Sequence, residues 1–134
     1  VGAASAEGGA ATFELAQITT DHSWVAEQVE AGVLTRDQMA AHPQRNLITR
    51  ALGAKPSVTV DLFKGTLGAG DTLLLCSDGV CGAVPEEAIR QILATRTLAD
   101  AAAELVAQAA RYGGDDNATA LVVHAGLIPA PSTS

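Results

Sequence analysis

The sequence LLLCSDGVCG, residues 73–82, runs from an apolar segment directly into a carboxylate. Its first part belongs to TLLLCS (72–77), whose nearly continuous apolar character predicts a β-strand that is covered on both faces. Asp78 and Gly79 follow at once, before a turn of small residues. A carboxylate at the end of a buried strand is costly unless something binds it, which raises the question of what Asp78 contacts.

A second acidic site precedes the last apolar segment of the chain. Asp116 and Asn117 come directly before ATALVVHA (118–125), which predicts a further strand. If this strand neighbours the strand at 72–77, the carboxylates of Asp78 and Asp116 converge at one edge of the sheet. Carboxylates placed in this way repel each other unless a cation lies between them, and hard oxygen ligands suit Mg²⁺ or Mn²⁺. Asp-Gly and Asp-Asn are also common turn dipeptides, so two ordinary turns are the alternative interpretation.

The remaining pattern predicts an α+β domain with helices layered on a mainly antiparallel β-sheet. Alternating apolar residues predict three further strands, at 13–19, 46–52 and 57–65. Helical spacing and capping residues predict four helices, at 21–32, 35–41, 85–94 and from Thr97 to Gly113. The opening stretch shows the period of neither a helix nor a strand. We therefore expect a linker or truncated end at 1–12, the domain at 13–125 and a flexible tail at 126–134.

Composition excludes several classes of function. The chain has 134 residues, 48% of them hydrophobic, and a net charge of −7, which is unsuited to binding nucleic acid or an anionic membrane surface. No apolar run approaches the 18 or so residues of a membrane span, and the start lacks the pattern of a signal peptide. We expect a soluble, cytoplasmic protein. The spacing of Cys76 and Cys81 predicts two small thiols rather than a zinc site or a disulfide.

Other residues carry weaker indications of chemistry. Gly79 allows a sharp turn after Asp78, and Asn117 could hold a neighbouring loop by hydrogen bonds. Ser77 lacks the pattern of an activated nucleophile. Arg45 and Arg50 could bind phosphate or form ordinary ion pairs, and the sequence leaves both alternatives open. The histidines show no spacing typical of metal ligands; they are His22, His42 and His124.

Three motifs in this order resemble the protein phosphatase 2C family, the PPM-type metal-dependent serine/threonine phosphatases, in their bacterial form. They are the tract from ITTDHSW to HPQRNLITRALG, then GDTLLLCSDGV, then GGDDNATALVV, within residues 13–125. The resemblance implies an α-β-β-α sandwich of which this chain is the C-terminal half. It implies that Asp78 and Asp116 bind a pair of Mg²⁺ or Mn²⁺ ions, with Asp115 as the spare.

The resemblance also implies roles for other residues and a reaction. Gly79 and Asn117 would support the ligands, whereas His42 and Arg45 would border the substrate groove. Metal-activated water would attack a phosphoserine or phosphothreonine of a protein substrate directly, with no phosphoenzyme and no catalytic side chain beyond the metal ligands.

The chain departs from the family pattern in its metal ligands. The N-terminal half of the family, which has an Asp-Gly pair with further metal-binding acids, is missing, and the sequence opens Val1-Gly2-Ala3-Ala4 where the family often has Val-Gly-Asp-Ser. Two carboxylates cannot fill the coordination spheres of two hard cations, which need about twelve oxygens. We expect a partial phosphatase that is inactive in isolation, or alternatively a non-catalytic interaction module. Exposed strand faces further predict a homodimer.

Overall fold

The computed structural model describes residues 2–6, 13–113 and 116–126. The chain divides into two compact units, of which the first comprises residues 1–18 and 65–134 and the second comprises residues 19–64. The described elements are, in chain order, β1 (Gly2–Ala6), β2 (Phe13–Gln17), α1 (Trp24–Glu30), α2 (Arg36–Ala41), β3 (Thr72–Cys76), α3 (Asp78–Cys81), α4 (Glu86–Thr95), α5 (Leu98–Arg111) and β4 (Ala120–His124).

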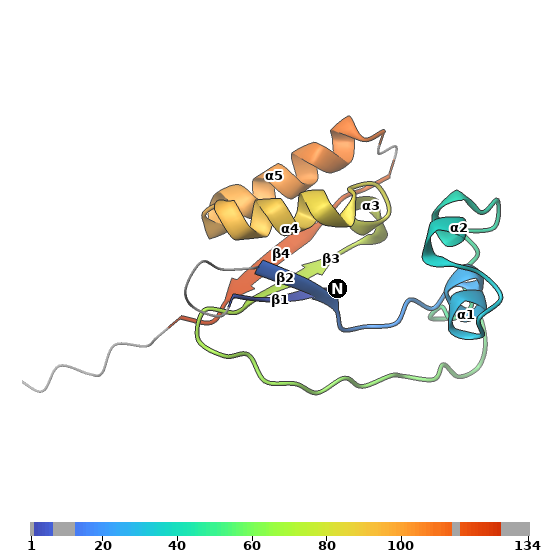
Figure 1. Cartoon of the computed structure of the whole chain (residues 1–134). Helices are drawn as coiled ribbons and strands as arrows, with labels where there is room; N and C mark the ends of the chain where they lie inside the picture. The colour runs from blue at the N-terminus through green and yellow to red at the C-terminus, as the bar shows by residue number, and fades with distance from the viewer. Residues whose placement is uncertain (1, 7–12, 114–115, 127–134) are drawn as a thin grey trace, which may run out of the picture. The chain divides into compact units, whose positions relative to one another are not determined.

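The first unit is a four-stranded antiparallel sheet with helices packed on one face (Figure 1). The strand order is β2-β1-β3-β4, so β2 and β4 form the two edges. In the β3–β4 pair, Leu74 lies opposite Val122 and Cys76 opposite Ala120. This arrangement confirms the predicted α+β class with helices layered on an antiparallel sheet.

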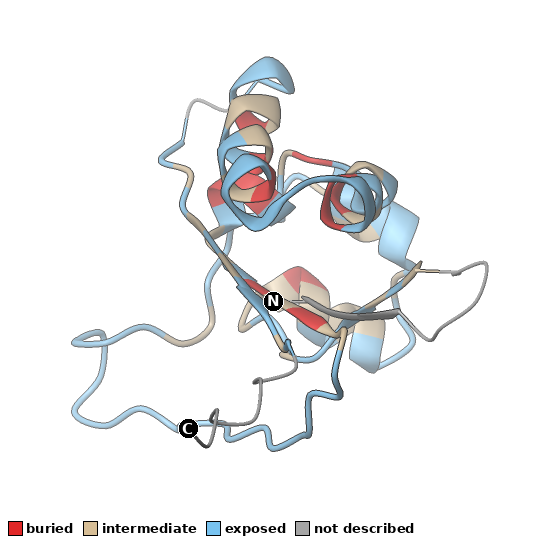
Figure 2. Cartoon of the chain, turned by 90° about the vertical axis from the view of Figure 1, so that its left-hand side faces the viewer, coloured by how far each residue is buried: buried red, intermediate tan, exposed pale blue. Residues whose placement is uncertain are grey.

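The core of the first unit lies between this sheet and its helices, where the red residues of Figure 2 gather. Leu74 supplies the sheet side, and Val80 of α3 and Leu105 of α5 are fully buried opposite it. Burying a side chain of this size contributes roughly 1.5–3 kcal/mol. Small residues on the inner face of α5 allow it to pack closely, namely Ala101 and Ala109.

Four of the described helices, α1, α2, α4 and α5, match predicted helices, whereas α3 forms where a turn of small residues was predicted. The Ser23 and Thr97 hydroxyls accept hydrogen bonds from the backbone N–H groups of Ala26 and Asp100, at 3.2 and 3.3 Å. Thr35 and Gln38 form a capping box at the start of α2. Such caps satisfy backbone donors that have no partner within the helix.

The prediction that residues 1–12 form a linker without a strand is wrong. Gly2–Ala6 forms β1, which pairs with β2 on one side and with β3 on the other. Its glycine, alanines and serine have low strand propensity and no apolar alternation, so the pattern of the sequence concealed it. Two neighbouring strands impose the conformation that the local sequence does not encode. The rest of the predicted linker, 7–12, and the tail from 127 lie outside the described residues.

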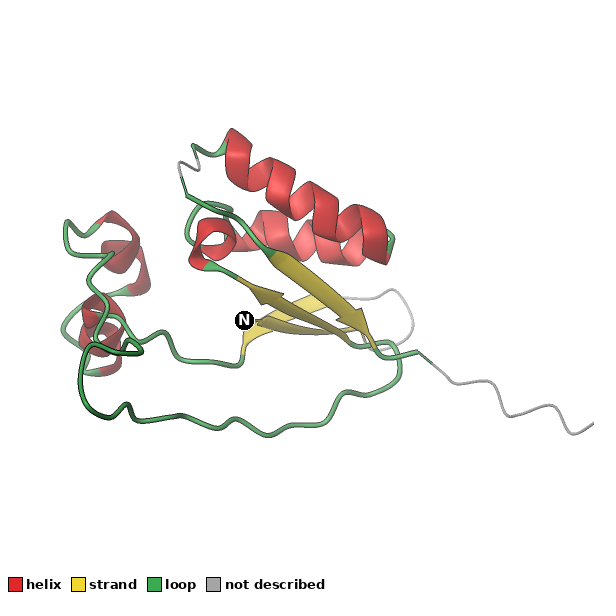
Figure 3. Ribbon diagram, turned by 180° about the vertical axis from the view of Figure 1, so that it is seen from behind, coloured by secondary structure: helices red, strands yellow, loops and turns green. Residues whose placement is uncertain are grey.

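The sheet face opposite the helices is apolar and exposed, which corrects the expectation that β3 is covered on both faces. Leu75 is 40% exposed on β3, and Leu121 and Val123 are 57% and 41% exposed on β4. Leu75 lies opposite Leu121 in the register, so these side chains share one face. Helices α4 and α5 contact the sheet from its other face only (Figure 3).

The second unit contains α1, α2 and connecting segments drawn as loops in Figure 3. The strands predicted at 46–52 and 57–65 are not formed, apart from an isolated bridge between Ser23 and Ile48. Residues 57–65 alternate as a strand would, but Leu62 is 82% exposed and no described strand pairs with them. An extended segment becomes a strand only where a partner accepts its hydrogen bonds.

Among the residues described, no helix has both the length and the apolar character to cross a membrane.

Candidate metal centre

The ends of β3 and β4 lie side by side, as the metal-site hypothesis requires. The strands are antiparallel neighbours, so the last residue of β3, Cys76, faces the first residue of β4, Ala120. One residue further out, the Ser77 N–H donates to the Thr119 carbonyl at 3.0 Å. The backbones that carry Asp78 and Asp116 therefore emerge from adjacent strands at one end of the sheet (Figure 1).

The Ser77 hydroxyl joins the two strand ends a second time. Its Oγ accepts a hydrogen bond from the Thr119 N–H at 3.0 Å and donates to the Asn117 carbonyl at 3.3 Å. Ser77 occupies the N-cap position of α3, yet its side chain caps no helix N–H. Sequence reasoning weighed Ser77 only as a nucleophile and missed this contact. The available signal was a hydroxyl residue between a strand and the next helix, directly before the acidic residue.

Gly79 allows a very close approach of the two segments. A Cβ built on Gly79 would lie 2.1 Å from the Asn117 carbonyl oxygen and 2.9 Å from its carbonyl carbon. Real Cβ atoms do not approach backbone atoms so closely, so only glycine fits. The chain does turn from β3 into α3 here, but Gly79 is buried inside α3 and is not among the described glycines with positive φ, so the close approach and not the turn requires glycine.

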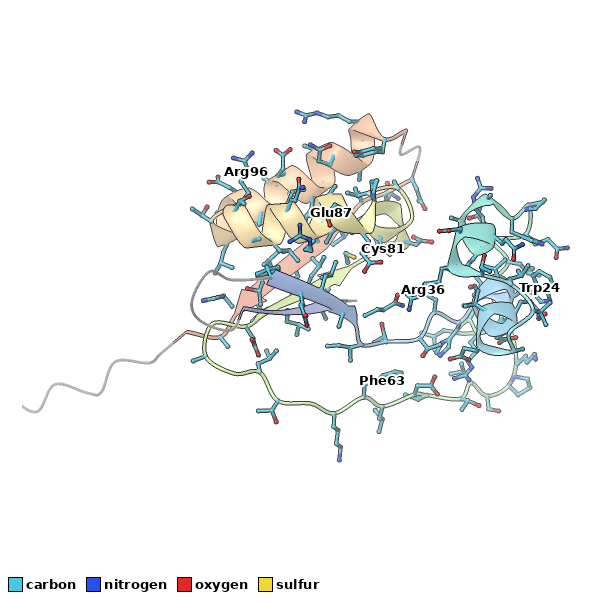
Figure 4. The ribbon with its side chains drawn as sticks, viewed as in Figure 1. Trp24, Arg36, Phe63, Cys81, Glu87 and Arg96 are labelled. Atoms are coloured by element: carbon cyan, nitrogen blue, oxygen red, sulfur yellow. The ribbon has the colours of Figure 1, made fainter. Side chains whose placement is uncertain are left out.

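Asp78 and Asp116 both present carboxylates to solvent at this end of the sheet. Asp78 is the first residue of α3, the short helix that also carries Cys81, labelled in Figure 4. The Asp116 Oδ1 accepts a hydrogen bond from the Asn117 N–H at 2.8 Å, which orients that carboxylate. Asn117 thus contributes through its backbone N–H and carbonyl.

The donor chemistry at these strand ends fits a hard divalent cation, because both groups are carboxylates. The set is only partial: within the part of the chain that the structure describes, no group of three or more His, Cys, Asp or Glu could hold a metal ion. Asp115, the spare ligand of the sequence analysis, lies outside the described residues. Asp78 and Asp116 can therefore form one part of a metal site.

His42 and Arg45, the residues expected at the substrate groove, belong to the second unit. The His42 ring lies against Trp24, with the ring centroids 5.1 Å apart, and its Nδ1 accepts from the Gln44 N–H at 3.1 Å. The Arg45 guanidinium donates to the His42 carbonyl at 3.4 Å. These contacts fix the turn after α2, and the role of the two residues in substrate binding stays a prediction.

The second unit also holds an ionic cluster that the sequence analysis missed. The Asp61 carboxylate lies 2.8 Å from His22 Nε2 and 2.9 Å from Arg50 Nη1. Hydrogen bonds from His22 and Arg50 hold the pKa of Asp61 below its usual value. Of the two alternatives left open for Arg50, the structure therefore shows ion pairing. The signal in the sequence was Asp61 itself, the single charge within the alternating segment SVTVDLF.

A comparison with models of protein families finds no match. The chain is nevertheless similar to curated proteins. The chain is 42% identical over 114 residues to a serine/threonine phosphatase stp of Listeria monocytogenes, and 41% identical over 111 residues to protein phosphatase PhpP of Streptococcus pneumoniae. These alignments cover 84% and 82% of this chain but 45% of each relative. The chain thus spans about half the length of the curated relatives it matches.

The chain is also similar to solved structures of serine/threonine phosphatases. The PPM Ser-Thr phosphatase MsPP from Mycobacterium smegmatis, solved in complex with cacodylate, is 37% identical with a TM-score of 0.79, and the match covers 93% of this chain and 52% of that one. The catalytic domain of PstP, solved with two manganese ions, is 34% identical with a TM-score of 0.68 over 90% of this chain and 48% of that one.

Proposed function

We propose, given that this chain belongs to the family of PPM-type serine/threonine phosphatases, that it forms one half of a metal-dependent protein phosphatase domain. The substrates would be proteins phosphorylated on serine or threonine. The observation that carries this proposal is the meeting of the Asp78 and Asp116 segments at adjacent strand ends, in a chain similar to known phosphatases over most of its length. We infer the C-terminal half from the order of the motifs.

In this proposal Asp78 and Asp116 hold Mg²⁺ or Mn²⁺. Such ions lower the pKa of bound water, which can then attack phosphorus, and they neutralise charge on phosphoryl oxygens. The chain's own contribution is to orient two carboxylates. Asp116 is oriented by the Asn117 N–H, and Asp78 is fixed at the start of α3, whose close packing depends on Gly79. The manganese ions of the related PstP structure support this choice of metal.

The chain by itself is expected to lack turnover. Two carboxylates leave most of the ligand positions of two hard cations to water or to other protein groups. The test is hydrolysis of a phosphothreonine peptide by the purified chain with millimolar Mn²⁺, compared with Asp78→Asn. We expect equal, background rates for the two proteins. Turnover by the unmodified chain that Asp78→Asn abolishes would refute the inactivity while supporting the ligand role.

We also propose that the chain acts in the cytoplasm and, as purified, associates with a second copy. The support for association is the exposed apolar face of β3 and β4, together with the open edge of β4. Patches of this kind drive contact with another protein surface. In a complete domain the same face would pack against the other half of the sandwich.

A second candidate function is a non-catalytic interaction module that keeps the phosphatase fold. The partial ligand set and the exposed outer sheet face favour it. The two candidates differ in what the coding gene contains upstream. An in-frame segment with the missing Asp-Gly motif supports the enzyme, whereas a gene without such a segment supports the module.

A further inference from the structure

The Ser77 hydroxyl joins the segments that carry the two proposed metal ligands, in a way that no ordinary strand pair requires. Hydrogen bonds between strands run from backbone to backbone, and the Ser77 N–H already donates to Thr119 in this manner. The side chain adds two more bonds, one from the Thr119 N–H and one to the Asn117 carbonyl. One hydroxyl therefore satisfies both a donor and an acceptor of the segment that leads into β4.

The positions of these bonds in the chain give them their importance. Ser77 immediately precedes Asp78, and Asn117 immediately follows Asp116. The hydroxyl thus fixes the distance between two backbones at one residue from each proposed ligand. A metal site needs its ligands held to within about 0.5 Å, and a second layer of hydrogen bonds usually supplies this precision.

The side chain of Ser77 could have served a different purpose, and the structure shows that it does not. Ser77 precedes α3, where a serine hydroxyl commonly accepts from the first helix N–H groups. Here the Ser77 carbonyl accepts from Val80 and Cys81, while the hydroxyl makes no cap and is directed to the segment before β4. The hydroxyl is therefore committed to joining the two strand ends.

We propose that Ser77 is a positioning residue that sets the spacing of the Asp78 and Asp116 carboxylates for a shared divalent cation. This inference rests on the proposed function, because it assumes that both residues are ligands. Replacing Ser77 by alanine leaves the Thr119 N–H and the Asn117 carbonyl without their side-chain partner. The segment 116–119 then moves relative to α3, and the two carboxylates lose their fixed spacing.

The first experiment measures amide hydrogen exchange by NMR in the intact chain and in Ser77→Ala, Ser77→Thr and Thr97→Ala. Thr97→Ala is the matched control, since it removes a hydroxyl that accepts from a backbone N–H elsewhere in the same unit. We expect Ser77→Ala to speed exchange at Thr119 about tenfold relative to Val122. Ser77→Thr and Thr97→Ala should keep the wild-type ratio. The proposal is overturned if Ser77→Ala leaves the ratio of the Thr119 to the Val122 exchange rate unchanged. It is also overturned if Ser77→Thr raises this ratio as much as Ser77→Ala does.

The second experiment separates positioning from a purely structural role. Mn²⁺ is titrated into the same four proteins and into Asp78→Asn, and binding is followed by paramagnetic broadening of amide signals. We expect Ser77→Ala to weaken binding about tenfold, with Ser77→Thr and Thr97→Ala within twofold of wild type. Equal binding by Ser77→Ala, with binding lost in Asp78→Asn, refutes the positioning role and leaves the proposed function intact. No binding by the unmodified chain refutes the ligand roles and the positioning role together.

Discussion

The carbonyl oxygen of Asn117 lies 2.1 Å from the point where a Cβ of Gly79 would stand. This contact links the helix that begins at Asp78 to the residue that follows Asp116. Since the approach is between backbones, no rotation of a side chain can relieve it. The spacing of the two acidic segments therefore depends on the absence of a side chain at Gly79.

Gly79→Ala should separate these segments. The added methyl group overlaps the Asn117 carbonyl, so either α3 or the start of β4 must shift, at a cost of about 1–3 kcal/mol or more. Chemical denaturation gives the change in the free energy of unfolding. Gly126→Ala is the control, because nothing lies within 4 Å of its Cβ position. Equal stability of Gly79→Ala and the wild type would contradict the packing described.

Leu105→Ala should destabilise the first unit strongly. Leu105 is fully buried between α5 and the sheet, and removing it leaves a cavity that costs roughly 2–5 kcal/mol. Its neighbour Val106 is 37% exposed, so Val106→Ala should cost far less. Urea unfolding followed by circular dichroism provides the comparison. Similar losses of unfolding free energy in the two variants would contradict the structure, in which α5 turns its Leu105 face toward the sheet.

The second unit should lose stability at acid pH through Asp61. Its lowered pKa means that the folded state favours the ionised carboxylate. The resulting stabilisation is present above the ordinary aspartate pKa of about 3.9 and is lost as the pH falls through the lower folded value. Fluorescence of Trp24, the one tryptophan in the sequence, can follow unfolding between pH 6 and pH 2.

Asp61→Asn is the matched variant for this experiment. It removes the charge that His22 and Arg50 contact, so it should be less stable than the wild type at pH 6, and the difference should shrink toward pH 2. A difference that stays constant with pH would show that the Asp61 charge contributes nothing to folding.

Self-association should depend on the outer face of the sheet. Replacing Leu121 and Val123 together by glutamine and threonine makes this face polar, and we expect weaker association in sedimentation at micromolar concentrations. Folding stability should change little, since both side chains are exposed. Leu98→Gln is the control, because Leu98 is comparably exposed on α5. A monomeric wild-type chain, or association unaffected by the double variant, would refute the proposed dimer.

The sequence predicted those features whose signals are local. Helix starts depend on residues such as Ser23 and Thr97, whose side chains bond to backbone three residues away. The start of α5 was predicted to within one residue, whereas α1 begins three residues after the predicted start at 21. The strand ending at Cys76 was clear because its apolar run is uninterrupted. The neighbouring placement of β3 and β4 was stated as a condition, and it holds.

Features that depend on distant partners were missed. Gly2–Ala6 is a strand because β2 and β3 flank it, and residues 57–65 are not a strand because no described strand pairs with them. The roles of Ser77 and Gly79 arise from contacts with residues 38 to 42 positions away, which no spacing rule reveals. Local patterns located the acidic residues, whereas only the fold showed how their backbones are held together.

The central claim, that Asp78 and Asp116 share a divalent cation, is tested most directly by Mn²⁺ broadening of amide signals in the wild type, Asp78→Asn and Asp116→Asn. Glu86→Gln serves as the control, since it removes an exposed acid from the same unit. The claim predicts broadening at residues 77–79 and 116–119 in the wild type and Glu86→Gln, and loss of both sets of effects in either aspartate variant. Broadening that persists in Asp78→Asn or Asp116→Asn, or that is absent from these residues in the wild type, would contradict it.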